Sequence, residues 1–496
     1  MITLRPSLNE FRESVGRGNL IPVVAEFVSD TQTPIGVFEK IAHEGACFLF
    51  ESAERNEESG RFSFIGFDPL VVIRSRNGSV TIRRDDLEDE TVLVADPLNR
   101  LQKVLAAFRF LPRPDIPHFH GGAVGFIGYD MVRFFEPKAT LHPQDDLSLP
   151  EMMFVIARTL VVFDHRFRKV RVINLADLDR QTPEAAYELA ERQIQRTVRR
   201  LAESSQLEPL PVPQIARKIP LTSNTFDFEA MVDRAKQYIG EGDIFQAVLS
   251  QRFEAAYSAD PLEIYRRLRF MNPSPYMFFL NFGDEFRALG SSPELHVRVR
   301  DRVAEMRPIA GTRPRGSDPR RDEANACDLL ADPKERAEHV MLVDLARNDL
   351  GRVAQFGSVR VTEQMTIERY SHVMHIVSQV QAQLRAGLNA FDVFRATFPA
   401  GTVSGAPKIR AMQIISELEK ARRGFYAGAV GWFDFEGNCD SCIALRSVVL
   451  SKDRAFVQAG AGIVADSVPS REREECENKA MAVLVAIASG ERECCS

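Results

Sequence analysis

The chain has no excess of positive charge and no long apolar run. Its 63 Lys and Arg residues are outnumbered by 69 Asp and Glu residues, which gives a formal net charge of −6 and a pI near 6.0. Because nucleic-acid recognition needs a basic surface, this balance argues against a nucleic-acid partner. No apolar run approaches the length of a membrane span, and residues 1–18 contain no apolar signal segment. We therefore expect a cytoplasmic protein with no membrane partner.

Cysteine is scarce, and its seven positions form no disulfide framework. An odd number of cysteines in a chain without a signal segment is typical of a reducing compartment. Cys439 and Cys442 are spaced like half of a zinc or redox site, but zinc needs a second pair and none stands nearby in the sequence. The surrounding residues alternate like a β-strand, so we interpret both cysteines as packing residues.

Internal repeats and regular strand–helix alternation are also absent. A chain of 496 residues is too long for one ordinary core and suggests two domains. Strands and helices come in groups, which favours the α+β class over a doubly wound sheet. Residues 204–225 hold four prolines and no hydrophobic period. The sequence therefore predicts an N-terminal domain over 1–203, a linker over 204–225 and a C-terminal domain over 226–490.

Periodicity predicts individual elements in both domains. In the first domain we expect strands at 48–50, 62–67, 70–76, 79–83, 159–164 and 169–174, and helices at 97–109 and 183–203. In the second domain we expect helices at 226–240, 261–271, 319–330, 333–348, 390–397 and 407–420, and a last helix that includes 470–480. Strands are expected there at 245–255, 276–282, 295–300, 426–434, 441–451 and 454–460.

Two of these helices, at 332–349 and 470–480, carry closely spaced carboxylates. Glu335 and Glu338 are three residues apart, as are Glu472 and Glu475, so each pair projects from one face of its helix. Like charges this close repel each other, and a hard cation between the helices would relieve the repulsion. Carboxylate oxygens that leave positions open for water and an anionic ligand suit Mg²⁺. The pattern indicates a divalent-metal site that holds a small acidic substrate.

Both helices also have a purely structural interpretation. Asp332 is a good N-cap, Pro333 suits the first helical position, and Glu335 stands where a capping-box glutamate belongs. In the second helix, two pairs have the spacing of ordinary surface ion pairs, namely Arg473 with Glu477 and Glu475 with Lys479. Periodicity alone leaves this alternative open.

Three segments that we expect to be loops are dense in Gly, Thr, Arg and Lys. They cover residues 307–316, 398–408 and 458–464. Backbone amides and fixed cations of this kind bind carboxylates. Any one segment could be a tight turn, but together with the two acidic helices they describe a pocket for an anionic substrate.

Four strings in these regions resemble the chorismate-utilising enzymes, and among them the branch that forms anthranilate. They are Pro-Ile-Ala-Gly-Thr-Arg-Pro-Arg-Gly at 308–316, Glu-His-Val-Met-Leu-Val-Asp-Leu-Ala-Arg-Asn-Asp-Leu at 338–350, Pro-Ala-Gly-Thr-Val-Ser-Gly-Ala-Pro-Lys at 399–408 and Gln-Ala-Gly-Ala-Gly-Ile-Val at 458–464. The resemblance extends from about residue 22 to residue 488. It implies a large two-domain α+β fold, with mainly antiparallel β-sheets packed in a sandwich and helices outside.

The resemblance also implies a reaction and its residues. Chorismate and ammonia give aminodeoxyisochorismate, which loses pyruvate to become anthranilate, the first step of L-tryptophan biosynthesis. The implied Mg²⁺ ligands are Glu338 and Glu475, supported by Glu335 and Glu472. The implied chorismate-binding residues are Gly311, Thr312, Tyr426, Arg446, Gly460, Ala461 and Gly462, and Lys479 adds positive charge to the same pocket.

Three further residues are expected to carry the chemistry. Glu294 resembles the family's general acid, which protonates the departing ring hydroxyl and so needs a raised pKa. His375 matches the histidine associated with pyruvate loss, and an imidazole titrates in the right range for proton transfer. We expect Thr402 to be a hydrogen-bonding partner in that second step.

Two positions separate this branch from its relatives. Where the isochorismate branch has a lysine that activates water, this chain has Gln246, whose amide cannot act as a base. Where the aminodeoxychorismate branch has a nucleophilic lysine, this chain has Ala310, which cannot attack the ring. Ammonia needs no base because it already carries a lone pair. These two absences favour anthranilate as product.

Residues 50–54 resemble the tryptophan feedback element of the family. Glu51 and Ser52 are its central residues, and Pro275, Tyr276 and Met277 supply the matching wall from the other domain. A ligand bound between two domains shifts their equilibrium if its affinity differs between the two states. The alternative is that Glu51 and Ser52 merely end a strand.

No segment resembles a glutamine amidotransferase, because no cysteine lies in a glycine-rich elbow. We therefore expect ammonia to come from a separate glutamine amidotransferase subunit, in a heterotetramer. Two rival functions stay open at this point. One is the large component of aminodeoxychorismate synthase, and the other is a non-catalytic tryptophan sensor that kept the fold.

Overall fold

The structure is a computed structural model. It describes residues 3–42, 45–53, 60–85, 87–113, 119–139, 142, 144–211, 222–223, 227–370 and 373–489. Most of the second half of the predicted linker, and the cysteines at 494 and 495, lie outside the described residues. The boundaries of the predicted domains stay a prediction.

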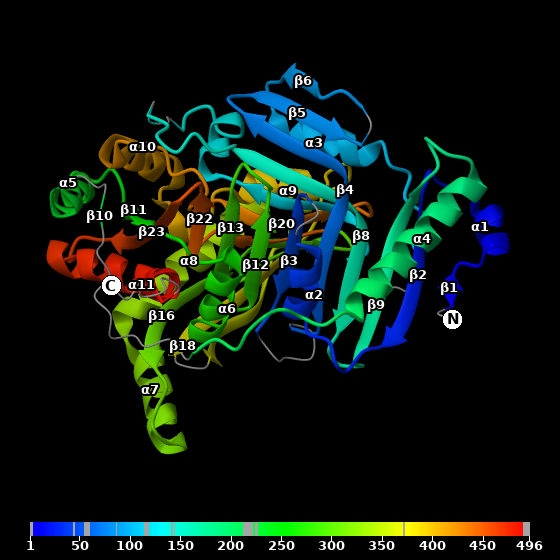
Figure 1. The fold of residues 1–496 in the computed structure, drawn as a ribbon. Coiled ribbons are helices and arrows are strands. Elements are labelled where there is room, and N and C mark those ends of the chain that lie inside the picture. The colour runs from blue at the N-terminus through cyan, green and yellow to red at the C-terminus, as the bar shows by residue number, and fades with distance from the viewer. Residues whose placement is uncertain are drawn as a thin grey trace.

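The helices lie on the outside of a large β-structure (Figure 1). They are α1 Leu8–Ser14, α2 Pro34–Ile41, α3 Pro97–Ala106, α4 Pro183–Leu201, α5 Phe228–Gly240, α6 Pro261–Met271, α7 Pro319–Ala331, α8 Pro333–Gly351, α9 Ala390–Thr397, α10 Lys408–Glu419 and α11 Pro469–Ala488, with short 3₁₀ helices at Tyr129–Phe134 and Gly401–Val403. Among the described residues, none of these helices is both long and apolar enough to cross a membrane.

Six of the helices begin in the same way, which explains why the sequence located five of them well; the sixth, α2, was not predicted. A Thr or Asp side chain accepts a hydrogen bond from the first turn, and a proline follows it at the first helical position. Proline loses nothing there, because the first amide groups of a helix have no partner within it. The cap and the proline together fix the starting residue.

The strands form one network in which every pair of named strands is antiparallel. They are β1 Leu4–Arg5, β2 Leu20–Val28, β3 Cys47–Glu51, β4 Phe62–Arg76, β5 Ser79–Arg84, β6 Glu90–Leu93, β7 Gly122–Ile127, β8 Met152–Asp164, β9 Lys169–Asp177, β10 Thr222–Ser223, β11 Gln246–Ala256, β12 Tyr276–Asn281, β13 Arg287–Ser292, β14 Leu295–Arg300, β15 Val303–Met306, β16 Ile309–Pro314, β17 Arg360–Arg369, β18 Val373–Gln383, β19 Gly405–Ala406, β20 Ala429–Asp434, β21 Cys439–Ile443, β22 Ser447–Ser451 and β23 Arg454–Ile463. The expected α+β class is confirmed.

Hydrogen bonds join strands from the two halves of the chain. β3 pairs with β12, so that Glu51 stands opposite Met277, and β7 pairs with β20, so that Val124 stands opposite Trp432. These two ladders bring the N-terminal half against the C-terminal half along whole strands.

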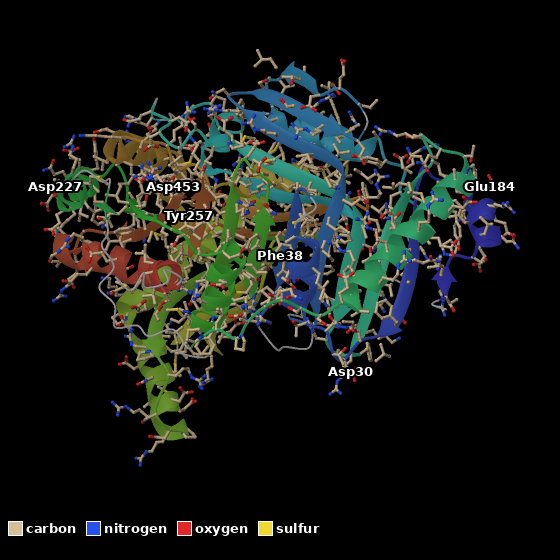
Figure 2. All side chains as sticks on the ribbon, viewed as in Figure 1. Asp30, Phe38, Glu184, Asp227, Tyr257 and Asp453 are labelled. Carbon is tan, nitrogen blue, oxygen red and sulfur yellow. The ribbon has the colours of Figure 1, made fainter. Side chains whose placement is uncertain are left out.

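Alternate residues of the strands build two apolar layers. Phe48 of β3 belongs to the core between the sheets, whereas its neighbour Leu49 belongs to the layer beneath the helices. This period of two is what a strand covered on both faces requires. Figure 2 shows Phe38 of α2 in the interior of the molecule, where it belongs to the helix layer, whereas Asp30 and Glu184 lie at its edge. The expected sandwich with helices outside is confirmed.

Three expectations about local structure are wrong. Residues 441–451 form two strands, β21 and β22, because the chain turns at Arg446, whose φ is +47°. Residues 307–316 are largely strand β16, although their composition suggested a loop, and the strand expected at 454–460 continues as β23 to Ile463, through most of the segment 458–464 that was also expected to be a loop. Residues 62–76 form one strand that passes through an irregularity near Asp68, whose φ is +54°.

The two cysteines of the zinc-like spacing are packing residues, as expected. Cys439 and Cys442 are both buried in β21 and neither forms a disulfide. Burial raises the pKa of the Cys442 thiol to about 12, so it is a neutral thiol at physiological pH.

Candidate active site

The N-terminal turns of the two acidic helices lie close together. Lys334 of α8 is 3.3 Å from Asp466, which precedes α11. The same lysine lowers the pKa of Glu338 on α8 and of Glu472 on α11, so its charge reaches carboxylates of both helices. The two helix starts are therefore close enough for the predicted shared site, which stays a prediction.

The carboxylates of this site are partly withdrawn from water and repel one another. Burial raises the pKa of Glu338, and the charge of Glu335 raises it further. Burial also raises the pKa of Glu472, with a second contribution from Glu475. These groups have the donor chemistry of a Mg²⁺ site, and a cation would relieve the repulsion.

In the described part of the chain, no group of three or more histidine, cysteine, aspartate or glutamate side chains is arranged to hold a metal ion. Mg²⁺ is usually bound through one or two carboxylates, with water and substrate oxygens as its other ligands. The carboxylates present fit that mode.

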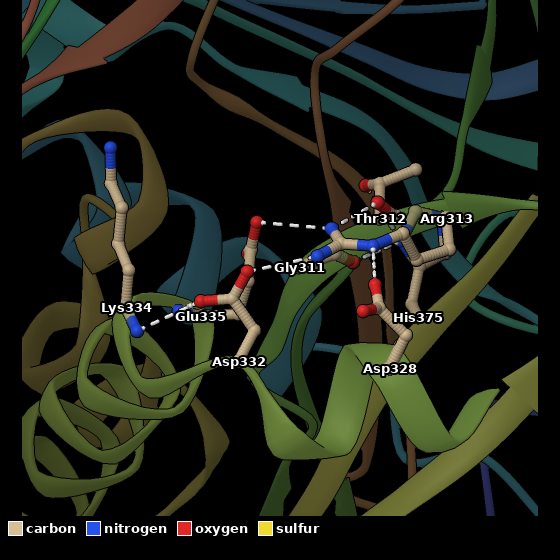
Figure 3. Close-up of polar contacts among 8 residues, drawn as sticks. All are labelled: Gly311, Thr312, Arg313, Asp328, Asp332, Lys334, Glu335 and His375. Atoms are coloured by element: carbon tan, nitrogen blue, oxygen red, sulfur yellow. Dashed lines mark hydrogen bonds and ion pairs between the residues drawn. The ribbon is translucent and has the colours of Figure 1, made fainter. Parts of the chain in front are cut away.

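Only part of the structural role expected for the first acidic helix is present: its N-cap forms, but the capping box expected for Glu335 does not. Asp332 caps α8 by accepting from the amides of Lys334 and Glu335 at 2.9 and 3.3 Å. Arg313 binds Asp328, Asp332 and Glu335 at 2.8, 2.9 and 3.5 Å, so Glu335 is an arginine partner (Figure 3).

On α11, both expected ion pairs form. Arg473 lies 2.9 Å from Glu477, and Lys479 lies 2.6 Å from Glu475. The capping and ion-pair interpretations are therefore compatible with the acidic site, and they account for part of its geometry.

Gly311 lies between the first acidic helix and His375, the predicted catalytic histidine. The residue lies in an irregular part of β16 and has a φ of +68°, which favours glycine. A Cβ atom at this position would lie 2.9 Å from Glu335 Oε2 and 2.9 Å from Leu329 Cδ1. Glycine is required here by conformation and by space.

The backbone of Gly311 also fixes the tautomer of His375. Nδ1 of His375 is 2.8 Å from the carbonyl oxygen of Gly311, and Thr312 Oγ1 is 3.1 Å from the same nitrogen (Figure 3). A carbonyl oxygen can only accept, so Nδ1 carries the proton and Nε2 of the neutral ring has the lone pair. Burial lowers the pKa of His375, and Arg446 lowers it further, so the ring is neutral and can act as a base.

Glu294 lies between β13 and β14, where its carboxyl group meets residues from three other elements. Burial raises its pKa to about 7, against opposing effects of the nearby Thr402 hydroxyl and of the charges of Lys479 and Arg446. A carboxyl group with this pKa holds a proton near neutral pH and can donate it. The structure therefore places Thr402 beside Glu294. The hydroxyl group that contacts His375 belongs to Thr312 and not to Thr402, the partner expected for that step.

Arg446 and Lys479 place two cations at this site. Arg446 lies in the turn between β21 and β22, and its carbonyl oxygen accepts from the amide of Ser291 at 3.1 Å. Lys479 donates to the carbonyl oxygen of Gly460 at 3.0 Å in addition to its pair with Glu475. Both cations lower the pKa of Glu294, so both lie near the expected reacting groups.

The glycines of β23 make room for neighbouring side chains. A Cβ at Gly460 would lie 2.7 Å from the hydroxyl of Tyr426, and a Cβ at Gly462 would lie 2.6 Å from Nε2 of Gln246. Ala461, between them, is buried and pairs with Leu249 of β11. The predicted substrate-binding strand is therefore built against Tyr426 and Gln246.

The two positions that distinguish the branches both lie next to site residues. Gln246 donates through Nε2 to Glu338 Oε1 at 3.4 Å. Ala310 precedes Gly311 on β16 and pairs with Ile376, the neighbour of His375. Neither position offers an amine.

A cavity of about 450 Å³ contains the predicted feedback element. All five predicted residues line it, namely Glu51, Ser52, Pro275, Tyr276 and Met277. Other lining residues are arginines and aromatic residues, among them Arg298, Arg307 and Trp432. The pairing of β3 with β12 explains why segments more than 200 residues apart meet here.

Glu51 is the last residue of β3, so it does end a strand, as the alternative interpretation of this element holds. Its carboxylate is also buried and bound by two neighbouring side chains. It accepts from the hydroxyl of Tyr265 at 3.0 Å and pairs with Arg269 at 3.2 Å. Burial raises its pKa, and Arg269 opposes this effect. Its neighbour in the cavity, Tyr276, donates to Asp440 at 3.2 Å.

Comparisons with known proteins agree with this site. Residues 45–485 match the model of the chorismate binding enzyme family. The chain belongs to the chorismate binding enzyme family. Two curated relatives are both named anthranilate synthase component 1. The one from Acetivibrio thermocellus is 46% identical over 97% of this chain and 98% of its own length, and the one from Pseudomonas putida is 46% identical over 96% of each.

A solved structure of the family has the same fold. The crystal structure of anthranilate synthase component I from Streptococcus pneumoniae superposes with a TM-score of 0.77 at 39% identity. The match covers 87% of this chain and 93% of that one. The fold expected from the resemblance is therefore confirmed for this member of the chorismate binding enzyme family.

Sequence reasoning missed a buried ion pair beneath the site of this family member. Arg423 pairs with Glu419 and donates to the carbonyl oxygens of Val403 at 2.7 Å and Val248 at 2.6 Å. The pair has ordinary i,i+4 spacing at the end of a helix, so the sequence offered no signal that it is buried. It ties the segment that carries Thr402 to strand β11.

A second missed pair is that of Asp349 and Lys408, at 2.6 Å. Both residues belong to the strings that carry the family resemblance. Their place in these strings was the sequence signal that pointed to the two residues, although the resemblance assigned neither of them a role.

Proposed function

We propose that this chain is the chorismate-converting subunit of an anthranilate synthase. The single observation that carries the proposal is the meeting of Glu294, whose pKa is about 7, with Arg446 and Lys479. A proton donor beside two cations suits a substrate that has two carboxylates and a departing hydroxyl. The names of the 46% identical relatives support the same activity.

Substrate binding would rest on cations and glycine-rich backbone. Arg446 and Lys479 attract the carboxylates of chorismate, while Gly460 and Gly462 let Tyr426 and Gln246 pack against β23, where they would face the ring. Mg²⁺, held by Glu338 and Glu475 with Glu335 and Glu472 nearby, would supply the positive charge that lets four carboxylates and an anionic substrate share one pocket. A water-excluding wall is formed by buried Tyr426.

The first step is substitution of the ring hydroxyl by ammonia. Glu294 donates its proton to the hydroxyl oxygen, the C–O bond breaks with its electron pair on oxygen, and water leaves. Ammonia supplies its lone pair to a new C–N bond at the ring carbon next to the carboxylate-bearing carbon. The two ring double bonds shift toward the carbon that loses the hydroxyl, and the nitrogen then releases one proton to solvent. Gln246 suits ammonia, because a water nucleophile would need a base at that position and an amide is not one.

The second step is loss of pyruvate. His375 Nε2 accepts the ring proton, and the electron pair of that C–H bond completes the aromatic ring as the C–O bond to the enolpyruvyl group breaks. That group takes up a proton and leaves as pyruvate. The carbonyl of Gly311 on Nδ1 stabilises the imidazolium that forms.

We further propose that tryptophan inhibits the chain from the 450 Å³ cavity. The cavity offers an aromatic wall, the buried carboxylate of Glu51 and several arginines, which suit an aromatic amino acid. Leu295 and Arg307 line both this cavity and a smaller one beside Glu294. A ligand that moves either residue would change the surroundings of the acid.

Steady-state assays test the proposed function. The isolated chain, given chorismate and Mg²⁺, should form fluorescent anthranilate with ammonium but not with glutamine, because the glutaminase is a separate subunit. Adding that subunit should confer glutamine-dependent activity. Release of 4-amino-4-deoxychorismate would instead assign the chain to the rival aminodeoxychorismate branch, and absence of turnover would favour a tryptophan sensor.

Mg²⁺ dependence has its own test. Removal of divalent cations should abolish turnover, and Glu338→Ala or Glu475→Ala should raise the Mg²⁺ concentration needed for half-maximal activity. Calorimetric titration with Mg²⁺ provides a readout independent of turnover. Normal Mg²⁺ binding in both variants would exclude these carboxylates as ligands.

A further inference from the structure

A small chamber of about 30 Å³ adjoins Glu294. Its polar lining residues are Glu294, Thr402, His296, Asp349 and Arg307, and its apolar wall includes Leu342 and Ala346. A space of this size with several polar neighbours suits one or two water molecules and is too small for chorismate. It therefore adjoins the expected general acid without being able to hold the substrate itself.

Asp349 is a buried carboxylate that the mechanism above does not use. Its Oδ2 accepts from Lys408 at 2.6 Å, and Lys408 also donates to the carbonyl oxygen of Thr397 at 3.3 Å. A carboxylate has about four acceptor positions, so one ammonium group does not saturate it. A buried ion pair adds little stability compared with apolar residues, so stability alone does not explain the charges of Asp349 and Lys408. A role of Asp349 in the chamber is therefore worth testing.

The nucleophile and the leaving group use different walls of the site. Gln246, at the position where a related branch activates its nucleophile, contacts Glu338 and Gly462 and does not line the chamber. Glu294, which serves the leaving group, does line it. The chamber is therefore on the side where water is produced.

We propose that the chamber is the leaving-group water site and that Asp349, held by Lys408, positions the water there. When Glu294 protonates the hydroxyl and the C–O bond breaks, the oxygen departs as one water molecule. That molecule is accommodated between Glu294 and Asp349 and does not need to pass the bound substrate. Asp349 is thus a positioning residue for the first step. The inference rests on the proposed anthranilate-forming reaction.

Filling the chamber provides the main test. Ala346 is buried on α8 and lines the chamber, so Ala346→Leu should occupy it. We expect kcat to fall at least about tenfold, the effect of about 1.4 kcal/mol, with the KM values for chorismate and ammonium unchanged. Ala354→Leu is the matched control, because Ala354 is buried in the same core cluster and does not line the chamber.

A pair of variants at Asp349 isolates its acceptor role. Asp349→Asn keeps a carbonyl acceptor and Asp349→Leu does not, while both leave Lys408 without its ion pair. The asparagine variant should retain most of kcat, and the leucine variant should lose about as much as Ala346→Leu. Equal kcat values in the two variants would mean that Asp349 is only structural.

Other outcomes would overturn the proposal. A raised KM for ammonium with unchanged kcat in Ala346→Leu would make the chamber a nucleophile site. A crystal structure of the wild-type protein should show water within hydrogen-bonding distance of Glu294 and Asp349, and its absence would contradict the proposal even if the variants fail to fold. If the wild-type protein forms no anthranilate from chorismate and ammonium, the proposed function fails. If it does and Ala346→Leu has normal kcat, only the chamber assignment fails.

Discussion

The proposed role of Glu294 as general acid predicts an activity that depends on pH in a defined direction. A general acid must be protonated, and the pKa of Glu294 is about 7 because of burial. The active form is therefore present below pH 7 and is lost as the pH rises through that value. We expect kcat/KM with chorismate to fall about tenfold for each pH unit above the pKa.

Thr402→Val provides a signed control for this assignment. The Thr402 hydroxyl beside Glu294 lowers the pKa of that carboxyl group, so removal of the hydroxyl should move the alkaline limb of the kcat/KM profile to higher pH. The variant keeps the shape of the side chain. A limb that stays in place or moves to lower pH would mean that another group titrates.

Gly311 is constrained by backbone conformation and by space, and the two can be separated. Gly311→Ala should lose about 1–2 kcal/mol to the left-handed conformation and a further ~1–3 kcal/mol to the clash with Glu335 and Leu329. Gly387 has a φ of +82° and open space around it, so Gly387→Ala should show the conformational cost alone. Urea unfolding of both variants measures the difference, and equal losses would contradict the close contact.

At the scale of elements, helix starts were predictable and glycine-rich strands were not. Asp332 and Pro333 identify the start of α8 locally, because a cap and a first-turn proline act within a few residues. β16 and the glycine-rich end of β23 look like loops in isolation, because glycine has a low strand propensity. Their glycines are explained by long-range neighbours, such as the Tyr426 hydroxyl beside Gly460, which no local pattern contains.

The buried pair of Arg423 and Glu419 connects α10 to β11, and its loss should be costly. Arg423→Met leaves the Glu419 carboxylate buried without its charge partner, which should cost about 3–5 kcal/mol of unfolding free energy. Arg12→Met removes a half-exposed pair with Glu184 and should change stability little. Chemical denaturation measures both. A small loss for Arg423→Met would show that the ion pair adds no stability at this junction.

At the scale of the whole molecule, the meeting of distant segments was predictable only through motifs. Spacing within a helix indicated the two glutamate pairs, but nothing local indicated that α8 and α11 face each other. The family resemblance supplied that link, and Lys334 confirms it by acting on carboxylates of both helices. The ion pairs of Arg423 and Asp349 escaped notice, because burial of a charged pair depends on the complete fold.

The 450 Å³ cavity joins the two halves of the molecule and should bind tryptophan. Ser52→Phe places a ring in this cavity and should raise the inhibitory concentration of tryptophan at least about tenfold, or about 1.4 kcal/mol, with little change in activity without tryptophan. Ser204→Phe, at an exposed position outside the cavity, is the control. Unchanged inhibition in Ser52→Phe would remove the regulatory site from this cavity.

The position of nitrogen on the product ring tests the central claim most directly. The purified chain should be incubated with chorismate, Mg²⁺ and ¹⁵N-labelled ammonium, and the product analysed by NMR and mass spectrometry. The chemistry of Glu294, His375, Gln246 and Ala310 predicts ¹⁵N-labelled anthranilate, with the amino group next to the ring carboxylate, together with one pyruvate. A product with nitrogen para to the carboxylate, or an unlabelled isochorismate, would contradict the account.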